Sequence, residues 1–143
     1  MLNHTAINGF RDILKETFDR QGWTIPTDTL EYTVKILADK LDKNPWQPEP
    51  SYAERYLTLK TATDALDLGN TCWFTRAVFP ELMERRGLKS SYFVQMGQGC
   101  YSLVLKHTEH PAVRTLYTHF EFTAEMAYTA VRHFNSQREM WDL

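Results

Sequence analysis

Residues 111–134 read PAVRTLYTHFEFTAEMAYTAVRHF and carry the strongest helical pattern in the chain. Their apolar side chains recur every three or four residues, the spacing that places them on one face of a helix; they are Val113, Leu116, Tyr117, Phe120, Ala124, Ala127, Val131 and Phe134. Pro111 suits a first helical turn, and Thr108 or His110 can cap it. We predict one continuous helix of more than about six turns, and an all-α fold that contains it.

The N-terminal part of the chain has the same periodicity. Residues 5–21 form an amphipathic helical pattern, and Gly22 follows in the position of a C-terminal cap. A second amphipathic segment comes next, which Thr27 or Asp28 can cap. Together the two segments predict a helical hairpin over residues 5–42.

Three prolines within residues 43–50 interrupt the helical pattern, because proline has no backbone N–H to donate. We interpret this stretch as a connector. Ser51 and Glu54 then match a capping box, and the pattern beyond them predicts a third helix that continues to Phe74. Gly69 lies inside that helix, where it predicts either a kink or another backbone that approaches closely.

The segment from residue 91 to residue 106 allows two interpretations. Aromatic and branched residues on both sides of Gly97-Gln98-Gly99 fit a β-hairpin. On helical spacing, four side chains form a single stripe, and the glycines permit another helix to pack closely; the four are Tyr92, Met96, Cys100 and Leu103. The local pattern leaves both interpretations open.

Length and composition favour a single globular domain. The chain has 143 residues, of which 43% are hydrophobic and 24% charged, as expected for one packed core. A short helix from Pro80 to Arg86 completes the expected set. We predict an all-α, single-domain bundle of about five to six helices, in which the hairpin and the proline-rich connector over 43–50 precede a helical core over 51–137.

The charge pattern argues against nucleic-acid partners. Sixteen Lys and Arg residues balance eighteen Asp and Glu residues, for a net charge of −2, whereas phosphate binding requires concentrated positive charge. No apolar run is long enough to span a membrane, and the first residues lack the pattern of a signal peptide. We therefore expect a cytoplasmic protein with neither membrane nor nucleic-acid partners.

No motif predicts catalysis, a metal or a cofactor. Cys72 and Cys100 have no local signature of an activated nucleophile, and free cysteine is usually buried, so we expect both in the core. Gly97-Gln98-Gly99 lacks the Lys and the Ser or Thr of a phosphate-binding loop. His107 and His110 have a spacing that zinc can use, but helix capping is the favoured interpretation.

One group of polar residues is a candidate site for a ligand or a partner. They lie within an aromatic segment, and they are Asn70, Arg76, Arg85, Arg86, Tyr92, Gln95 and Tyr101. A few convergent hydrogen-bonding groups of this kind can orient a ligand in a pocket. The favoured interpretation is structural, with Asn70 satisfying a kinked backbone and the two arginines closing a helix end.

The same segment resembles an uncharacterised bacterial family of small proteins. The shared motifs, over about residues 57–105, are Leu68-Gly69-Asn70, Phe79-Pro80-Glu81, Arg85-Arg86-Gly87, Tyr92-Phe93 and Met96-Gly97. Asn70 occupies a position where the family has aspartate, so the resemblance supports no role that needs a carboxylate there. It implies a helical fold, which favours a helix over residues 91–106. It implies no activity, because the family has none assigned.

Function is therefore predicted only in outline. An aromatic content of 13%, a near-neutral charge and the lack of a catalytic motif favour a non-enzymatic protein that contacts other proteins as a regulator or accessory subunit. Trp46, Trp73 and Trp141 are candidate contact residues, and we expect self-association, with a homodimer as its simplest form. The alternative is a helical protein, including an enzyme, that binds a small molecule or cofactor at the polar cluster around Asn70 and Tyr92.

Overall fold

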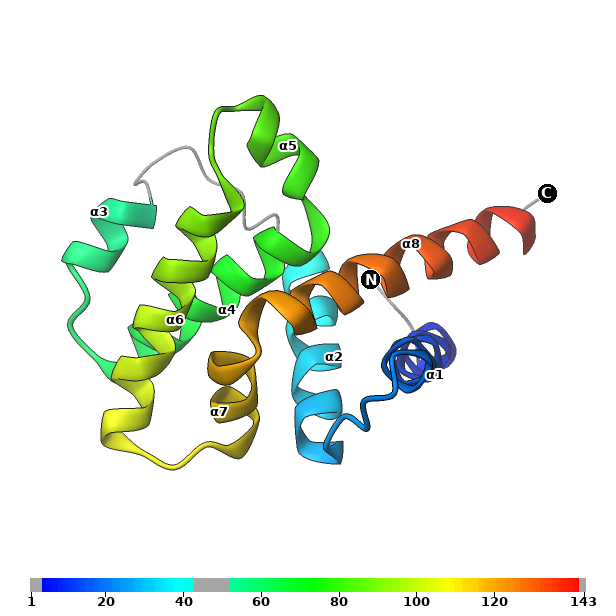
Figure 1. Cartoon of the computed structure of the whole chain (residues 1–143), viewed down its shortest axis with the longest axis horizontal. Coiled ribbons are helices and arrows are strands. Elements are labelled where there is room, and N and C mark those ends of the chain that lie inside the picture. Colours follow the sequence, from blue (N-terminus) through cyan, green and yellow to red (C-terminus); the bar gives the residue numbers. More distant parts are fainter. Residues whose placement is uncertain (1–3, 43–51, 142–143) are drawn as a thin grey trace.

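The computed structural model describes residues 4–42 and 52–141, which form helices and no strands. Figure 1 shows how these helices are arranged, with α4 and α6 side by side. In chain order they are α1 (His4–Arg20), α2 (Thr27–Asp42), α3 (Tyr52–Leu57), α4 (Ala62–Val78), α5 (Pro80–Arg85), α6 (Ser90–His107), α7 (Pro111–Thr118) and α8 (Phe120–Trp141). The all-α prediction is confirmed. The predicted number of helices, five to six, is wrong, because the described residues form eight.

The predicted helix from Tyr52 to Phe74 is two helices, α3 and α4, with a turn between them. Thr61 has an extended backbone (φ −138°, ψ 161°), and its side-chain oxygen accepts a hydrogen bond from the Asp64 backbone N–H at 3.1 Å. Threonine competes for backbone donors in this way, so it favours a helix start over a helix interior. α4 then continues through Gly69 as one helix.

The predicted single helix over residues 111–134 is also interrupted. α7 ends at Thr118, His119 has non-helical angles (φ −121°, ψ 43°), and α8 begins at Phe120. Beyond the break Phe120 is 1% exposed, and its ring centre lies 5.9 Å from that of Tyr101. Burying such a side chain contributes about 1.5–3 kcal/mol, which favours the interruption of the helix at His119. No glycine or proline marks this position in the sequence.

The helical interpretation of residues 91–106 is confirmed, because α6 spans all of them. A Cβ atom at Gly97 would lie 2.4 Å from the Phe120 ring, and one at Gly69 would lie 2.8 Å from the Tyr101 ring. Close approach therefore accounts for Gly69, although the approaching group is a side chain rather than the predicted backbone. Both glycines let aromatic rings pack directly against helix backbone.

Trp73 is completely buried, so the prediction that it contacts a partner is wrong. Its side chain is 0% exposed, and its indole Nε1 donates a hydrogen bond to Thr123 Oγ1 at 3.0 Å. This bond joins α4 to α8 inside the core. Trp46 and the side chain of Trp141 lie outside the described residues, so their predicted contacts stay predictions.

The N-terminal helices α1 and α2 are in contact, and α1 also packs against α8 (Figure 1). Gly22 follows α1 with a φ of 72°, the left-handed conformation that favours glycine at a helix end, as the sequence predicts. Within residues 4–42 and 52–141, every helix is too short or too polar to span a bilayer. The proline-rich connector and Ser51 of the predicted capping box lie outside the described residues.

Candidate functional site

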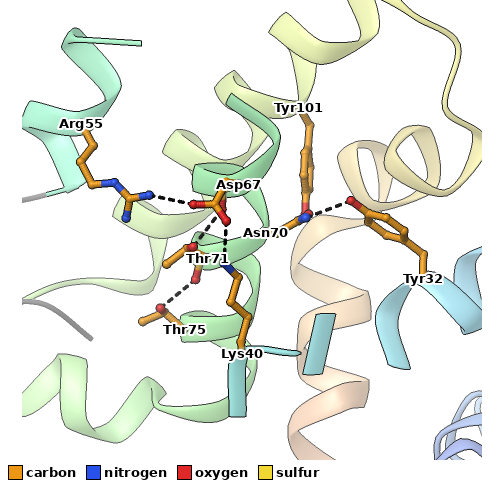
Figure 2. Close-up of polar contacts among 8 residues, drawn as sticks. All are labelled: Tyr32, Lys40, Arg55, Asp67, Asn70, Thr71, Thr75 and Tyr101. Atoms are coloured by element: carbon orange, nitrogen blue, oxygen red, sulfur yellow. Dashed lines mark hydrogen bonds and ion pairs between the residues drawn. The ribbon is translucent and has the colours of Figure 1, made fainter. Parts of the chain in front are cut away.

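Two predicted site residues meet in a hydrogen-bonded chain that also includes Tyr32 (Figure 2). The Tyr101 hydroxyl on α6 donates to Asn70 Oδ1 on α4 at 2.8 Å, and Asn70 Nδ2 donates to the Tyr32 hydroxyl on α2 at 2.9 Å. Tyr101 is fully buried, whereas Asn70 and Tyr32 are partly buried. The chain connects three helices, and both ends of the Asn70 amide are used within the fold.

Burial raises the pKa of both tyrosine hydroxyls above the ordinary value of 10.0, at which they are already protonated at neutral pH. It raises the pKa of Tyr101 well above the ordinary value, and neighbouring Tyr32 adds to this effect. Burial also raises the pKa of Tyr32, against the opposing influence of the Asn70 hydrogen bond. A general acid or base works best with a pKa near the operating pH, so this geometry suits structural support. The Asn70 side chain bonds to the Tyr32 and Tyr101 hydroxyls, whereas the sequence predicts that it satisfies backbone groups.

The other predicted site residues lie at separate places. Arg76 on α4 pairs with Glu121 on α8 at 3.5 Å. Arg85 is exposed in the last turn of α5, where a basic side chain suits the helix end. Tyr92 is partly buried and Gln95 is exposed, both on α6. The described structure therefore joins Asn70 to Tyr101 directly and gives Arg76 a different partner.

A second polar group, which the sequence pattern does not predict, surrounds Asp67 (Figure 2). Its carboxylate pairs with Lys40 of α2 at 2.7 Å and with Arg55 of α3 at 3.1 Å. Along α4, the Thr71 hydroxyl donates to the Asp67 carbonyl, and the Thr75 hydroxyl to the Thr71 carbonyl, each at 2.8 Å. The Asp67 side chain is 58% exposed, so each ion pair contributes only about 0–1 kcal/mol. The group holds α2 and α3 to α4.

Tyr32 also borders a groove between α2 and α7. The groove has a volume of about 370 Å³, and it is lined by Asp28, Glu31, Tyr32, Lys35, His110, Pro111 and Ala112. His110 Nδ1 accepts a hydrogen bond from the Val113 backbone N–H at 3.2 Å, which confirms His110 as the cap of α7. The imidazole packs edge-on against the Tyr32 ring, with 4.8 Å between ring centres. The sequence predicts the cap but not the groove.

Both cysteines are buried, as predicted, and burial makes them poor nucleophiles. Cys72 and Cys100 are each 0% exposed. Burial raises the pKa of the Cys100 thiol to about 11, and it raises the pKa of Cys72 in the same direction, whereas the thiolate is the reactive form. Among the described residues, no three His, Cys, Asp or Glu side chains are placed to share a metal ion.

Alkaline pH is expected to destabilise the fold through these buried groups. Their folded-state pKa values are raised above the ordinary 9.0 of cysteine and 10.0 of tyrosine, so the unfolded chain loses its protons first and is favoured as the pH rises. The stabilisation is complete below about pH 9, and the Cys100 share is lost as the pH approaches 11, the value that its pKa reaches. Urea unfolding followed from neutral to alkaline pH measures this loss. Cys72→Ala is expected to make the free energy of unfolding depend less steeply on pH. A free energy of unfolding that stays constant up to pH 11 would contradict the raised pKa values of the buried groups.

The outward surface of α6 is distinguished by its lack of charge. Residues 90–105 include no charged side chain. Five exposed or partly exposed positions at alternating four- and three-residue spacing form what we call the α6 face: Ser91, Gln95, Gln98, Ser102 and Leu105. Tyr56 of α3 and Tyr117 of α7 flank it and are 36% and 38% exposed. The Tyr56 hydroxyl would lie 2.9 Å from a Cβ at Gly99, and Gln98 Nε2 donates to the Tyr117 carbonyl at 3.1 Å.

Comparison with known proteins gives no relative for this chain. No protein-family model matches it, and no curated protein or solved structure does. The resemblance to an uncharacterised bacterial family therefore stays a prediction. The function has to be inferred from the geometry of this chain itself.

Proposed function

We propose that this protein is non-enzymatic and acts as a regulator or accessory subunit, by binding another protein through the α6 face. The observation that carries the proposal is an uncharged helix surface between two half-exposed tyrosines, Tyr56 and Tyr117. Charged residues make up 24% of the chain. Their absence over residues 90–105 therefore distinguishes this surface helix from the rest of the chain. Protein interfaces are depleted in charge at their centres and enriched in tyrosine; the α6 face has no charge, and Tyr56 and Tyr117 lie on either side of it.

The chemistry of the polar and nucleophilic groups supports a non-enzymatic role. The Asn70 amide is satisfied by Tyr32 and Tyr101 within the fold. The thiols of Cys72 and Cys100 are buried, and burial raises the pKa of both. A catalytic acid, base or nucleophile has to reach its substrate in the reactive protonation state. These groups are better suited to stabilising the bundle.

Affinity capture with three matched baits tests the proposal. Gln95→Arg introduces a charge on the α6 face, whereas Gln21→Arg makes the same change at an exposed position after α1. We expect at least one protein of a cytoplasmic extract, the compartment we propose, to be retained by the unaltered chain and by Gln21→Arg but lost with Gln95→Arg. Recovery of the same proteins on all three baits would count against the α6 face as the binding surface.

A second candidate function is the binding of a small molecule or cofactor, which the groove between α2 and α7 favours. Its volume of about 370 Å³ is enough for a small ligand, but the groove is wide open to solvent and would enclose only part of one. Tyr32 borders the groove and bonds to Asn70. A ligand in the groove would therefore contact one end of the hydrogen-bonded series Tyr32, Asn70 and Tyr101. A thermal-shift panel of metabolites and metals tests this candidate, because a ligand at 100 times its Kd adds about 2.7 kcal/mol. A shift that Tyr32→Ala abolishes would support it, and a panel without any shift would remove it.

A further inference from the structure

We infer that His110 is a pH-sensitive switch between α2 and α7, which caps α7 while its imidazole is neutral and releases the first turn of α7 when the ring is protonated. The switch lies at the groove between these two helices and does not depend on the α6 face. Histidine is the side chain whose charge ordinarily changes between pH 5 and 8. A contact that needs a lone pair on an imidazole nitrogen is therefore sensitive to pH in this range.

In the closed state the imidazole of His110 is a hydrogen-bond acceptor. Its Nδ1 accepts from the Val113 backbone N–H at 3.2 Å, so the ring is neutral and carries its proton on Nε2. The same ring packs edge-on against Tyr32 of α2, with 4.8 Å between ring centres. One neutral side chain therefore holds both the start of α7 and its contact with α2.

The first turn of α7 depends on this acceptor. Pro111 begins the helix without an N–H, and the first backbone bond runs from the Arg114 N–H to the His110 carbonyl at 2.9 Å. Val113 is 0% exposed, and a buried N–H without an acceptor is costly. α7 has only eight residues, and a helix this short is marginal without support from its ends and its packing.

A protonated His110 cannot hold this cap. Its Nδ1 then carries a hydrogen, so two donors would face each other where the Val113 N–H now meets a lone pair. The N-terminus of α7 also carries partial positive charge, which disfavours a cation beside it. His110 is partly exposed, so its ring can take up a proton from water and turn away from α7. The Val113 N–H then loses its acceptor, and the first turn of α7 loosens.

The groove between α2 and α7 offers the protonated ring a more favourable place. Its titratable side chains from α2 are Asp28, Glu31, Tyr32 and Lys35. Glu31 pairs with Arg11 at 2.8 Å, so we expect the imidazolium to approach the Asp28 carboxylate instead. The other charged or titratable residues next to His110 in the chain are exposed, so solvent and salt screen their charges; they are Lys106, His107, Glu109 and Arg114. The ring therefore has two defined positions, on Val113 when neutral and towards Asp28 when charged.

Hydrogen exchange of the Val113 amide, followed by NMR, tests the inference. Its protection relative to an unstructured chain at the same pH is expected to fall about fivefold between pH 8 and pH 5, the factor that corresponds to a lost cap of about 1 kcal/mol. Contacts between the His110 and Tyr32 rings are expected in the nuclear Overhauser spectrum at pH 8 and not at pH 5. Asparagine is a good cap that does not titrate, so His110→Asn is expected to keep the protection constant. His107→Asn, at an exposed position three residues earlier, is expected to respond like the unaltered chain.

A second pair of variants tests the position of the protonated ring. Asp28→Asn removes the carboxylate that favours the imidazolium, so the loss of Val113 protection is expected to have its midpoint at a lower pH. Asp12→Asn makes the same charge change at an exposed position of α1 and is expected to leave the midpoint where it is.

Three results would overturn the switch. They are a His110 ring that stays neutral down to pH 5, a Val113 protection that stays constant while the ring becomes protonated, and a loss of protection that His110→Asn shows equally. A midpoint that Asp28→Asn leaves unmoved would overturn the position of the imidazolium beside Asp28. The capture experiment with Gln95→Arg decides the proposed function separately, because it alters a different surface.

Discussion

Replacing Trp73 with alanine is expected to lower the free energy of unfolding by about 3–5 kcal/mol, the usual cost of deleting a large aromatic side chain from a core. Trp73 is 0% exposed, so little water can fill the space that its ring leaves. The change also removes the hydrogen bond that Nε1 donates to Thr123. Urea unfolding followed by circular dichroism measures the loss. Because a typical domain is stable by only about 5–15 kcal/mol, the variant is expected to be close to unfolding at 37 °C.

Two further variants show whether the loss comes from packing. Trp73→Phe keeps most of the ring volume but removes the indole donor, so we expect a smaller loss, of about 1–3 kcal/mol. Leu57→Ala changes a side chain that is 83% exposed and is expected to stay within about 0.5 kcal/mol of the unaltered chain. A Trp73→Ala protein as stable as Leu57→Ala would show that Trp73 is not in the core.

Replacing Gly97 with alanine is expected to lower the free energy of unfolding by about 1–3 kcal/mol, because the added methyl group overpacks the core. Its Cβ would lie 2.4 Å from the Phe120 ring, which is 1% exposed, and 3.3 Å from the Cβ of Cys72. Both neighbours are buried, so a shift of either one disturbs the packing of the core. Alanine is ordinarily the better helix former by about 1 kcal/mol, so the clash has to exceed that gain. Thermal or urea unfolding gives the sign directly.

Gly9 provides a matched control, because it also lies within a helix but has no atom within 4 Å of the position that a Cβ would occupy. Gly9→Ala is expected to stabilise the chain by about 0.5–1 kcal/mol. Combining Gly97→Ala with Phe120→Leu is expected to recover part of the loss, because the clash with the ring is removed. Equal stabilisation by Gly97→Ala and Gly9→Ala would contradict the close packing of α6 on α8.

Helix positions could be predicted where the signals lie within a few residues of one another. Apolar spacing marked residues 5–21 as a helix, and Gly22 marked its end. Pro80 and Pro111 begin α5 and α7, as their fixed backbone angle suggests. The interruption at His119 could not be found in this way. Both sides of it have helical periodicity, and the burial of the Phe120 ring favours the break.

The candidate site was predictable only in part, because its contacts join distant segments. Asn70 and Tyr101 were identified from their polar character within an aromatic segment. Their partner Tyr32 was missed, since the Asn70 to Tyr32 hydrogen bond spans 38 residues of sequence. The same reason hid the pairing of Asp67 with Lys40 and Arg55, in which no local pattern connects the residues.

Local sequence was sufficient for the helical class, the helix ends at Gly22 and His110, and the burial of both cysteines. Spacing, capping and intrinsic preference act over about four residues, so a linear pattern contains them. Packing between distant helices was needed to bury Trp73 and to leave the α6 face exposed. A helix has several sides that a neighbour can cover, and which side is covered depends on the free energy of the whole assembly of helices.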